Sequence, residues 1–125
     1  MRKAAVAWLE VPGRGALLSR GRIEPRHPSY PVWCLWIEDA LYVVTGPDEQ
    51  QAPGLAQAAV VRVSARGDHG GRILTWLARV SRVRPDSDRW AEVVRPLAAK
   101  RLNGPPKQAL IDRWAGTASI MRLAP

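Results

Sequence analysis

The sequence predicts a mainly β (α+β) fold, an antiparallel barrel of about six strands with flanking helices. Short segments rich in Val, Trp, Tyr and Ile alternate with turns that contain Gly, Pro or Asp over most of the chain, which is typical of barrels and sandwiches. One capped amphipathic pattern near the C-terminal third predicts a helix packed on that barrel. The chain has 125 residues, enough for one core and too few for two ordinary domains, so we expect residues 1–125 to form a single domain.

The first half of the chain predicts a hairpin preceded by one short strand. Ala16–Leu18 is bracketed by glycines and is assigned to the first strand. Tyr30–Ile37 and Leu41–Thr45 follow, and the short segment 38–40 between them is the expected turn. Both faces of Tyr30–Ile37 are apolar, so we expect this strand to be buried on both sides, against either a helix or a partner subunit.

The middle of the chain predicts a short helix and two strands. Pro53–Ala58 has a proline suited to a first helical turn. Val60–Arg66 alternates apolar and polar residues, and Arg72–Val83 is long enough to predict a bent strand.

The C-terminal part predicts two helices and a closing strand. Asp88–Arg101 follows capping side chains and repeats apolar residues at helical spacing, with Pro96 predicting a kink or a restart. Gln108–Trp114 is assigned to a second short helix and Ala118–Leu123 to the last strand.

Charge and hydropathy limit the partners. The chain carries 19 basic and 11 acidic residues, a net charge of +8, which favours anionic partners. The arginines are spread along the chain without a block of like charges, so a solvated basic surface is the favoured interpretation and nucleic-acid binding is the least favoured partner. No apolar run approaches the roughly 18 residues of a membrane span, and no secretory signal is evident, so we expect a cytoplasmic protein without membrane contact.

Few residues have the pattern of catalytic or metal-ligating groups. Cys34 lies in an apolar run, which predicts an unreactive core thiol. His27 and His69 lie among prolines and glycines and are expected in surface loops. No hydrolase, phosphate-loop or metal motif is present, so catalytic residues stay unknown and no metal site is predicted.

The order of five short segments resembles the flavin-binding split-barrel family related to pyridoxamine phosphate oxidase, from about Trp8 to Val83. The family commonly begins with a leucine-containing helix and a glycine-marked strand, continues with a Pro-Val-Trp strand and a tight turn, and enters a strand that ends in Thr-Gly. The matching segments here are Trp8-Leu9-Glu10, Gly15-Ala16-Leu17-Leu18, Tyr30-Pro31-Val32-Trp33, Glu38-Asp39-Ala40-Leu41-Tyr42 and Thr45-Gly46.

The resemblance implies a split barrel that forms a homodimer, with FMN or a deazaflavin coenzyme in a groove between the two barrels. Val32 and Trp33 would then approach the ring system, and Thr45 and Gly46 would lie near the ribityl chain or the phosphate. We also expect the doubly apolar strand Val32–Ile37 to lie near the subunit interface, because exposed apolar patches of that size are rare on monomers.

The loop after Thr45 departs from the family. Gln51 and Pro53 stand where the family usually has a lysine and an arginine. A phosphate is held best by charged donors, so we expect cofactor binding to be weak or lost unless another arginine, such as Arg62, compensates.

Three functions are therefore open. The first is a flavin- or deazaflavin-dependent oxidoreductase of unknown small-molecule substrate. The second is a degenerate barrel without cofactor that serves as a ligand-binding or interaction module. The third is a basic nucleic-acid binder.

Overall fold

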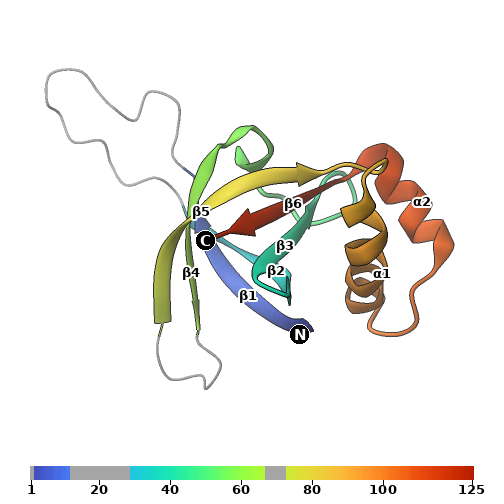
Figure 1. Ribbon diagram of the computed structural model, residues 1–125, viewed down its shortest axis with the longest axis horizontal. Helices are drawn as coiled ribbons and strands as arrows, with labels where there is room; N and C mark the ends of the chain where they lie inside the picture. The colour runs from blue at the N-terminus through green and yellow to red at the C-terminus, as the bar shows by residue number, and fades with distance from the viewer. Residues whose placement is uncertain (1, 12–28, 67–72) are drawn as a thin grey trace, which may run out of the picture.

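Six strands close into one antiparallel barrel in the computed structural model, which describes residues 2–11, 29–66 and 73–125 (Figure 1). The order around the barrel is β1-β2-β3-β6-β5-β4, so the fold class predicted from the sequence is confirmed. The strands are β1 (Arg2–Glu10), β2 (Ser29–Ile37), β3 (Ala40–Thr45), β4 (Val60–Arg66), β5 (Ile73–Val83) and β6 (Ser119–Ala124).

Two helices pack side by side at one end of the barrel, α1 (Asp88–Leu102) and α2 (Gln108–Thr117) (Figure 1). The capping prediction for α1 is confirmed, because the Ser87 hydroxyl oxygen accepts a hydrogen bond from the Trp90 N–H at 3.3 Å. The helix continues through Pro96 as one element, so no restart occurs there. The short helix expected at residues 53–58 is a single 3-10 turn, η2 (Leu55–Gln57).

The first strand differs from the prediction. Ala16–Leu18 lies outside the described residues, and β1 takes the first place in the barrel instead. All nine residues of β1 pair with β2, and its last four also pair with β4. Trp8-Leu9-Glu10, which the resemblance matched to a helix, is therefore part of a strand. The alternation that marks a strand was hidden because Ala4–Leu9 is uniformly apolar.

The hairpin prediction is confirmed. β2 and β3 pair antiparallel from Leu35↔Tyr42 to Ile37↔Ala40, with a tight turn at residues 38–39. Glu38 has a φ of 60°, which the turn requires and which only a few non-glycine residues adopt.

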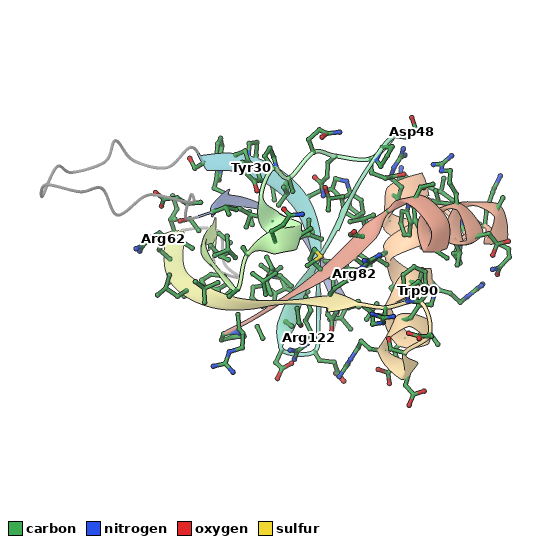
Figure 2. All side chains as sticks on the ribbon, turned by 90° about the horizontal axis from the view of Figure 1, so that it is seen from above. Tyr30, Asp48, Arg62, Arg82, Trp90 and Arg122 are labelled. Carbon is green, nitrogen blue, oxygen red and sulfur yellow. The ribbon has the colours of Figure 1, made fainter. Side chains whose placement is uncertain are left out.

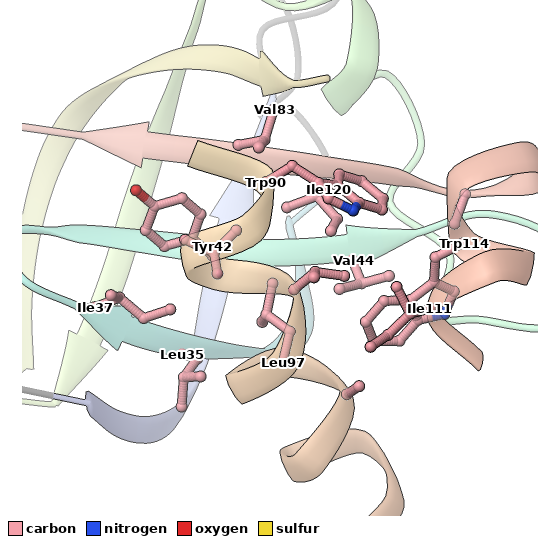
Figure 3. Packing of buried hydrophobic residues seen from close by; sticks show 14 of the residues in the cluster. Leu35, Ile37, Tyr42, Val44, Val83, Trp90, Leu97, Ile111, Trp114 and Ile120 are labelled. Carbon is pink, nitrogen blue, oxygen red and sulfur yellow. The ribbon is translucent and has the colours of Figure 1, made fainter. Parts of the chain in front are cut away.

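Two apolar clusters hold the fold together, one inside the barrel and one between the barrel and the helices. The inner cluster includes Val32, Cys34, Leu41, Val43, Val61, Val63, Met121 and Leu123, with Leu55 of η2 packed among them. The outer cluster places strand residues against helix residues (Figure 3), and its members include Leu35, Ile37, Tyr42, Val44, Val83, Ile120, Trp90, Leu97, Ile111 and Trp114.

Both faces of β2 are buried, as its sequence predicts. Val32 and Cys34 point into the barrel, whereas Leu35 and Ile37 belong to the cluster that the helices cover. A partner subunit is therefore not needed to explain the second apolar face, and our reason for placing an interface at Val32–Ile37 was wrong.

Cys34 is a core residue, as predicted. Its side chain is fully buried, and burial raises the pKa of its thiol to about 12, with a backbone hydrogen bond at Ala7 acting in the opposite direction. Since the thiolate is the reactive form, this thiol is unreactive near neutral pH. No helix among the described residues is long and apolar enough to cross a bilayer.

Candidate functional site

Polar and charged side chains gather around a pocket of about 430 Å³ at the helical end of the barrel. We call it the Trp33 pocket. Its volume lies within the range of small-molecule sites, roughly 300–1,000 Å³. It is lined by β2, by the loop between β3 and η2 and by the last turn of α1, with the residues Trp33, Asp48, Glu49, Gln50, Lys100 and Arg101.

Gln50 fixes the wall of the pocket that Trp33 forms. The Gln50 Oε1 accepts a hydrogen bond from the Trp33 N–H at 2.8 Å, and its Nε2 donates to the carbonyls of Trp33 at 2.8 Å and Val44 at 3.1 Å. The β2–β3 ladder ends before this point, at Leu35↔Tyr42. The Gln50 amide therefore takes the place of a strand neighbour where β2 and β3 separate, and it holds the backbone of Trp33 in position.

Glu49 ties the same loop to both helices. Its side chain is only 1% exposed. One carboxylate oxygen accepts a hydrogen bond from Arg101 Nε at 2.9 Å, and the other accepts from Arg113 Nη2 at 3.3 Å. Arg101 belongs to α1 and Arg113 to α2, so a single carboxylate joins the loop to both helices. Two guanidinium groups balance its negative charge.

The charge around the pocket is slightly positive. Asp48, Glu49, Lys100 and Arg101 line the pocket, and Arg113 pairs with Glu49 from α2, which makes three cations against two carboxylates. Among the described residues Lys100 makes no salt bridge, so its ammonium is available to an anion. Lys100 and Arg101 also lie in the last turn of α1, where positive charge stabilises the helix end without any ligand.

Of the two residues expected near a flavin ring, one borders the pocket. Trp33 lines it, whereas Val32 points into the barrel and is 2% exposed. Adjacent strand residues face opposite sides of the sheet, so the two side chains cannot approach the same face of one ligand.

The residues expected near a phosphate do not form an open cradle. Thr45 pairs with Ser119 of β6 at the end of β3. A Cβ at Gly46 would lie 3.0 Å from both the Ala118 Cα and the Thr117 carbonyl oxygen, and φ there is 149°. Gly46 is therefore needed for close packing of the backbone onto the start of β6, and this space is filled by the chain itself.

Gln51 directly follows Gln50, whose carbonyl accepts a hydrogen bond from the Gly46 N–H at 3.4 Å, so its backbone lies close to Gly46. Gln51 is exposed and makes none of the hydrogen bonds of its neighbour Gln50. Arg62 lies on the outer face of β4, where its Nε is 3.4 Å from Glu10 Oε1. Figure 2 shows Arg62 towards one end of the barrel and Asp48, on the loop, towards the helical end. Within one chain, the structure therefore brings Gln51 close to Gly46 but does not bring Arg62 to the same place.

Several residues of the pocket were missed by sequence reasoning. Glu49, Lys100, Arg101 and Arg113 are far apart in the chain and meet only through the packing of α1 and α2. Gln51 was named instead of Gln50 because it stands where the family usually has a lysine. Only the conformation of the loop decides which of the two amides turns inward.

A larger pocket of about 700 Å³ lies along α1, lined by Ile37, Glu38, Arg89, Ala91, Glu92, Arg95, Pro96, Ala99 and Pro106. None of the six residues expected to bind a cofactor lines it, and two of its charged side chains, Arg89 and Glu92, pair with each other at 3.2 Å. It offers no aromatic side chain, so the Trp33 pocket is the better candidate.

Comparisons with protein-family models, with curated proteins and with solved structures gave no match for this chain. Within the described residues, no group of three or more His, Cys, Asp or Glu side chains could hold a metal ion. The site is therefore interpreted from its own geometry.

Proposed function

We propose that the barrel is a ligand-binding module whose Trp33 pocket takes a small anionic molecule with a planar ring. One observation carries the proposal: Trp33 and Lys100, which makes no salt bridge with the part of the chain that the structure describes, line the same pocket. An aromatic side chain offers a face on which a planar ring can stack. A lysine ammonium forms a charge-assisted hydrogen bond with phosphate or carboxylate.

Flavin and deazaflavin coenzymes belong to this ligand class, and a flavin- or deazaflavin-dependent oxidoreductase is the second candidate. It is favoured by the fact that Trp33, a residue that the resemblance places near the ring, lines the pocket. When bound, such a coenzyme would supply the redox chemistry, and the chain would hold and orient it. The packing of Gly46 against Ala118 argues for the ligand-binding module over this enzyme.

Nucleic-acid binding has less support. Base stacking along a strand uses several exposed aromatic side chains, yet Trp114 is fully buried and Trp90 is 9% exposed. Trp36 and Trp76 stack on each other, with ring centroids 5.8 Å apart. Trp8, at 50%, is the one tryptophan that is largely exposed, and all six tryptophans belong to the described residues.

The test is a set of titrations at low ionic strength with FMN, riboflavin, a deazaflavin coenzyme, pyridoxal phosphate and ATP. We expect at least one phosphorylated compound to bind with micromolar affinity, and we expect riboflavin, which lacks the phosphate, to bind more weakly than FMN. Lys100→Ala should weaken binding of the phosphorylated compound by about tenfold, since each 1.4 kcal/mol is a factor of ten.

Lys107→Ala is the matched control, because it removes the same charge from an exposed lysine that does not line the pocket. It should leave the affinity unchanged. Equal losses in the two variants would show that only the net charge of the protein matters. No binding of any phosphorylated compound at millimolar concentration would contradict the proposal.

A further inference from the structure

Apolar side chains of β1 and β2 continue the surface of the Trp33 pocket along the outside of the barrel. Strand pairing places Val6 directly opposite Trp33, and Trp8 directly opposite Pro31. Residues opposite each other in a ladder lie on the same face of the sheet, with Cβ atoms about 5 Å apart. We call the side chains of Val6, Trp8 and Pro31 the β1–β2 strip, which adjoins the Trp33 wall of the pocket.

The strip faces solvent. Ala7 and Leu9, the alternate residues of β1, belong to the cluster inside the barrel and are fully buried. Alternation along the strand therefore turns Val6 and Trp8 outward. Their exposed fractions are 60% and 50%, and Pro31 is also exposed.

The cover that the helices give to β2 ends beside this strip. Leu35 and Ile37, on the outer face of β2, are buried in the cluster beneath the helices. Two positions before Leu35, Trp33 is only partly buried, and two positions earlier again Pro31 is exposed. The cluster beneath the helices contains no residue of β1. The strip therefore remains an open apolar surface at the edge of the pocket.

Polar groups lie at both ends of the strip. Trp33 shares the pocket with Lys100 and lies opposite Val6 in the ladder. At the far end, the next outward pair after Trp8 is Glu10 opposite Ser29, and Glu10 is held by Arg62 at 3.4 Å. A cation, an aromatic ring, an apolar strip and a polar end thus follow one another along this surface.

We propose that the ligand of the Trp33 pocket is an amphiphilic aromatic anion whose hydrocarbon extension lies on the β1–β2 strip. It rests on the proposed function, since Lys100 binds the anionic group and Trp33 the planar ring. The extension removes its own apolar surface and that of Val6 and Trp8 from water, which favours such a ligand over the same ring without the extension.

The size of the strip indicates a single dissolved molecule. Val6 and Trp8 are about 7 Å apart along β1, and neighbouring strands are about 5 Å apart. This area matches one short hydrocarbon group. The Glu10–Ser29 pair then limits its length, because burying a carboxylate under hydrocarbon is unfavourable.

The first experiment compares phenyl phosphate with para-butylphenyl phosphate by isothermal titration calorimetry on the full chain at low ionic strength. Phenyl phosphate supplies the anion and the ring, and the butyl group supplies the extension. We expect the butyl compound to bind about tenfold more tightly, because a group covered on one side gains about half the effect of full burial.

The second experiment repeats both titrations on Trp8→Thr, which removes the largest side chain of the strip and keeps a residue suited to a strand. The ratio of the two affinities should fall to about threefold or less, with the affinity for phenyl phosphate unchanged. Leu77→Thr is the matched control, because Leu77 is 59% exposed on β5, which β4 separates from β1. It should keep the full ratio. Lys100→Ala should weaken both compounds by the same factor.

The outcomes separate this proposal from the proposed function. If phenyl phosphate binds but the butyl group adds less than about twofold, or if Trp8→Thr keeps the full ratio, the strip does not bind the extension and the pocket remains an anion site. If no phosphorylated compound binds at millimolar concentration, both proposals are wrong. Co-sedimentation with phosphatidylglycerol vesicles, without binding of para-butylphenyl phosphate, would assign the strip to a lipid surface and also overturn this proposal. Circular dichroism of each variant distinguishes lost binding from a lost fold.

Discussion

The Glu49 carboxylate should contribute more to stability than any exposed ion pair of this chain, and Glu49→Gln tests this. The substitution keeps the size of the side chain and one acceptor oxygen, so the contact to Arg101 at 2.9 Å can survive as a neutral hydrogen bond. The other position becomes an amide that donates, and it then faces the Arg113 donor that was 3.3 Å from the carboxylate.

The expected loss follows from these two contacts. A hydrogen bond to a charged group contributes about 1.5–3 kcal/mol and a neutral one about 0.5–1.5 kcal/mol. Arg101 and Arg113 are 38% and 47% exposed, so solvent screening reduces the loss. We expect Glu49→Gln to lower the free energy of unfolding by about 2 kcal/mol, which corresponds to roughly 8 °C in Tm for a chain of this size.

Urea denaturation followed by circular dichroism measures this loss. With a slope of about 1.5 kcal/mol per molar urea, the midpoint should fall by about 1.3 M. The matched control is Glu92→Gln, which breaks the exposed 3.2 Å pair with Arg89 and should change stability by less than about 0.5 kcal/mol. If the two variants have the same midpoint, Glu49 does not join the loop to the helices in the way described.

Three further predictions concern single positions. Gln50→Ala removes the hydrogen-bond partners of the Trp33 and Val44 backbone groups. It should lower the free energy of unfolding by about 2–3 kcal/mol in the same denaturation assay. Gln51→Ala, at the exposed neighbouring position, should have no effect. Gly46→Ala places a Cβ 3.0 Å from backbone atoms and should lower the free energy of unfolding by at least about 2 kcal/mol. Its control is Gly116→Ala, in open space within α2, which should raise the free energy of unfolding by up to about 1 kcal/mol. Equal effects of the two variants would contradict the packing assigned to Gly46. Burial raises the pKa of the Cys34 thiol to about 12 in the folded state, against about 8.5 in the unfolded chain. The contribution of the thiol to the free energy of unfolding is therefore complete below about pH 8.5 and is lost as the pH rises towards 12. Between about pH 8.5 and 10 the stability of Cys34→Ala should fall less steeply than that of the wild type, and parallel curves would refute the burial of this thiol.

Much of the fold was predictable because its signals are local. The two apolar faces of Tyr30–Ile37, the turn after it and the capping residue before α1 each depend on neighbours within a few residues. The structure confirms the β2–β3 hairpin, the strands β4, β5 and β6 and both helices. The missed strand, β1, has a uniformly apolar segment from Ala4 to Leu9 in which no period of two is visible.

The candidate site was predictable only in part. Trp33 was named from the resemblance and lines the pocket, while Val32, Gly46 and Arg62 have other positions. Gly46 illustrates the difficulty, because a glycine that admits a phosphate and one that admits a neighbouring backbone look the same in sequence. The distinction depends on where β6 begins, about seventy residues further on.

By itself, the sequence determined the class of fold, the positions of most strands and helices and the burial of Cys34, because propensity, periodicity and capping act over short distances along the chain. Only the tertiary structure decided that helices cover the second face of β2, that Glu49 lies between two arginines and that Val6, Trp8, Ile73 and Leu77 are exposed. These features arise from contacts between residues far apart in sequence, and such contacts are set by closure of the barrel and by the packing of the helices on it.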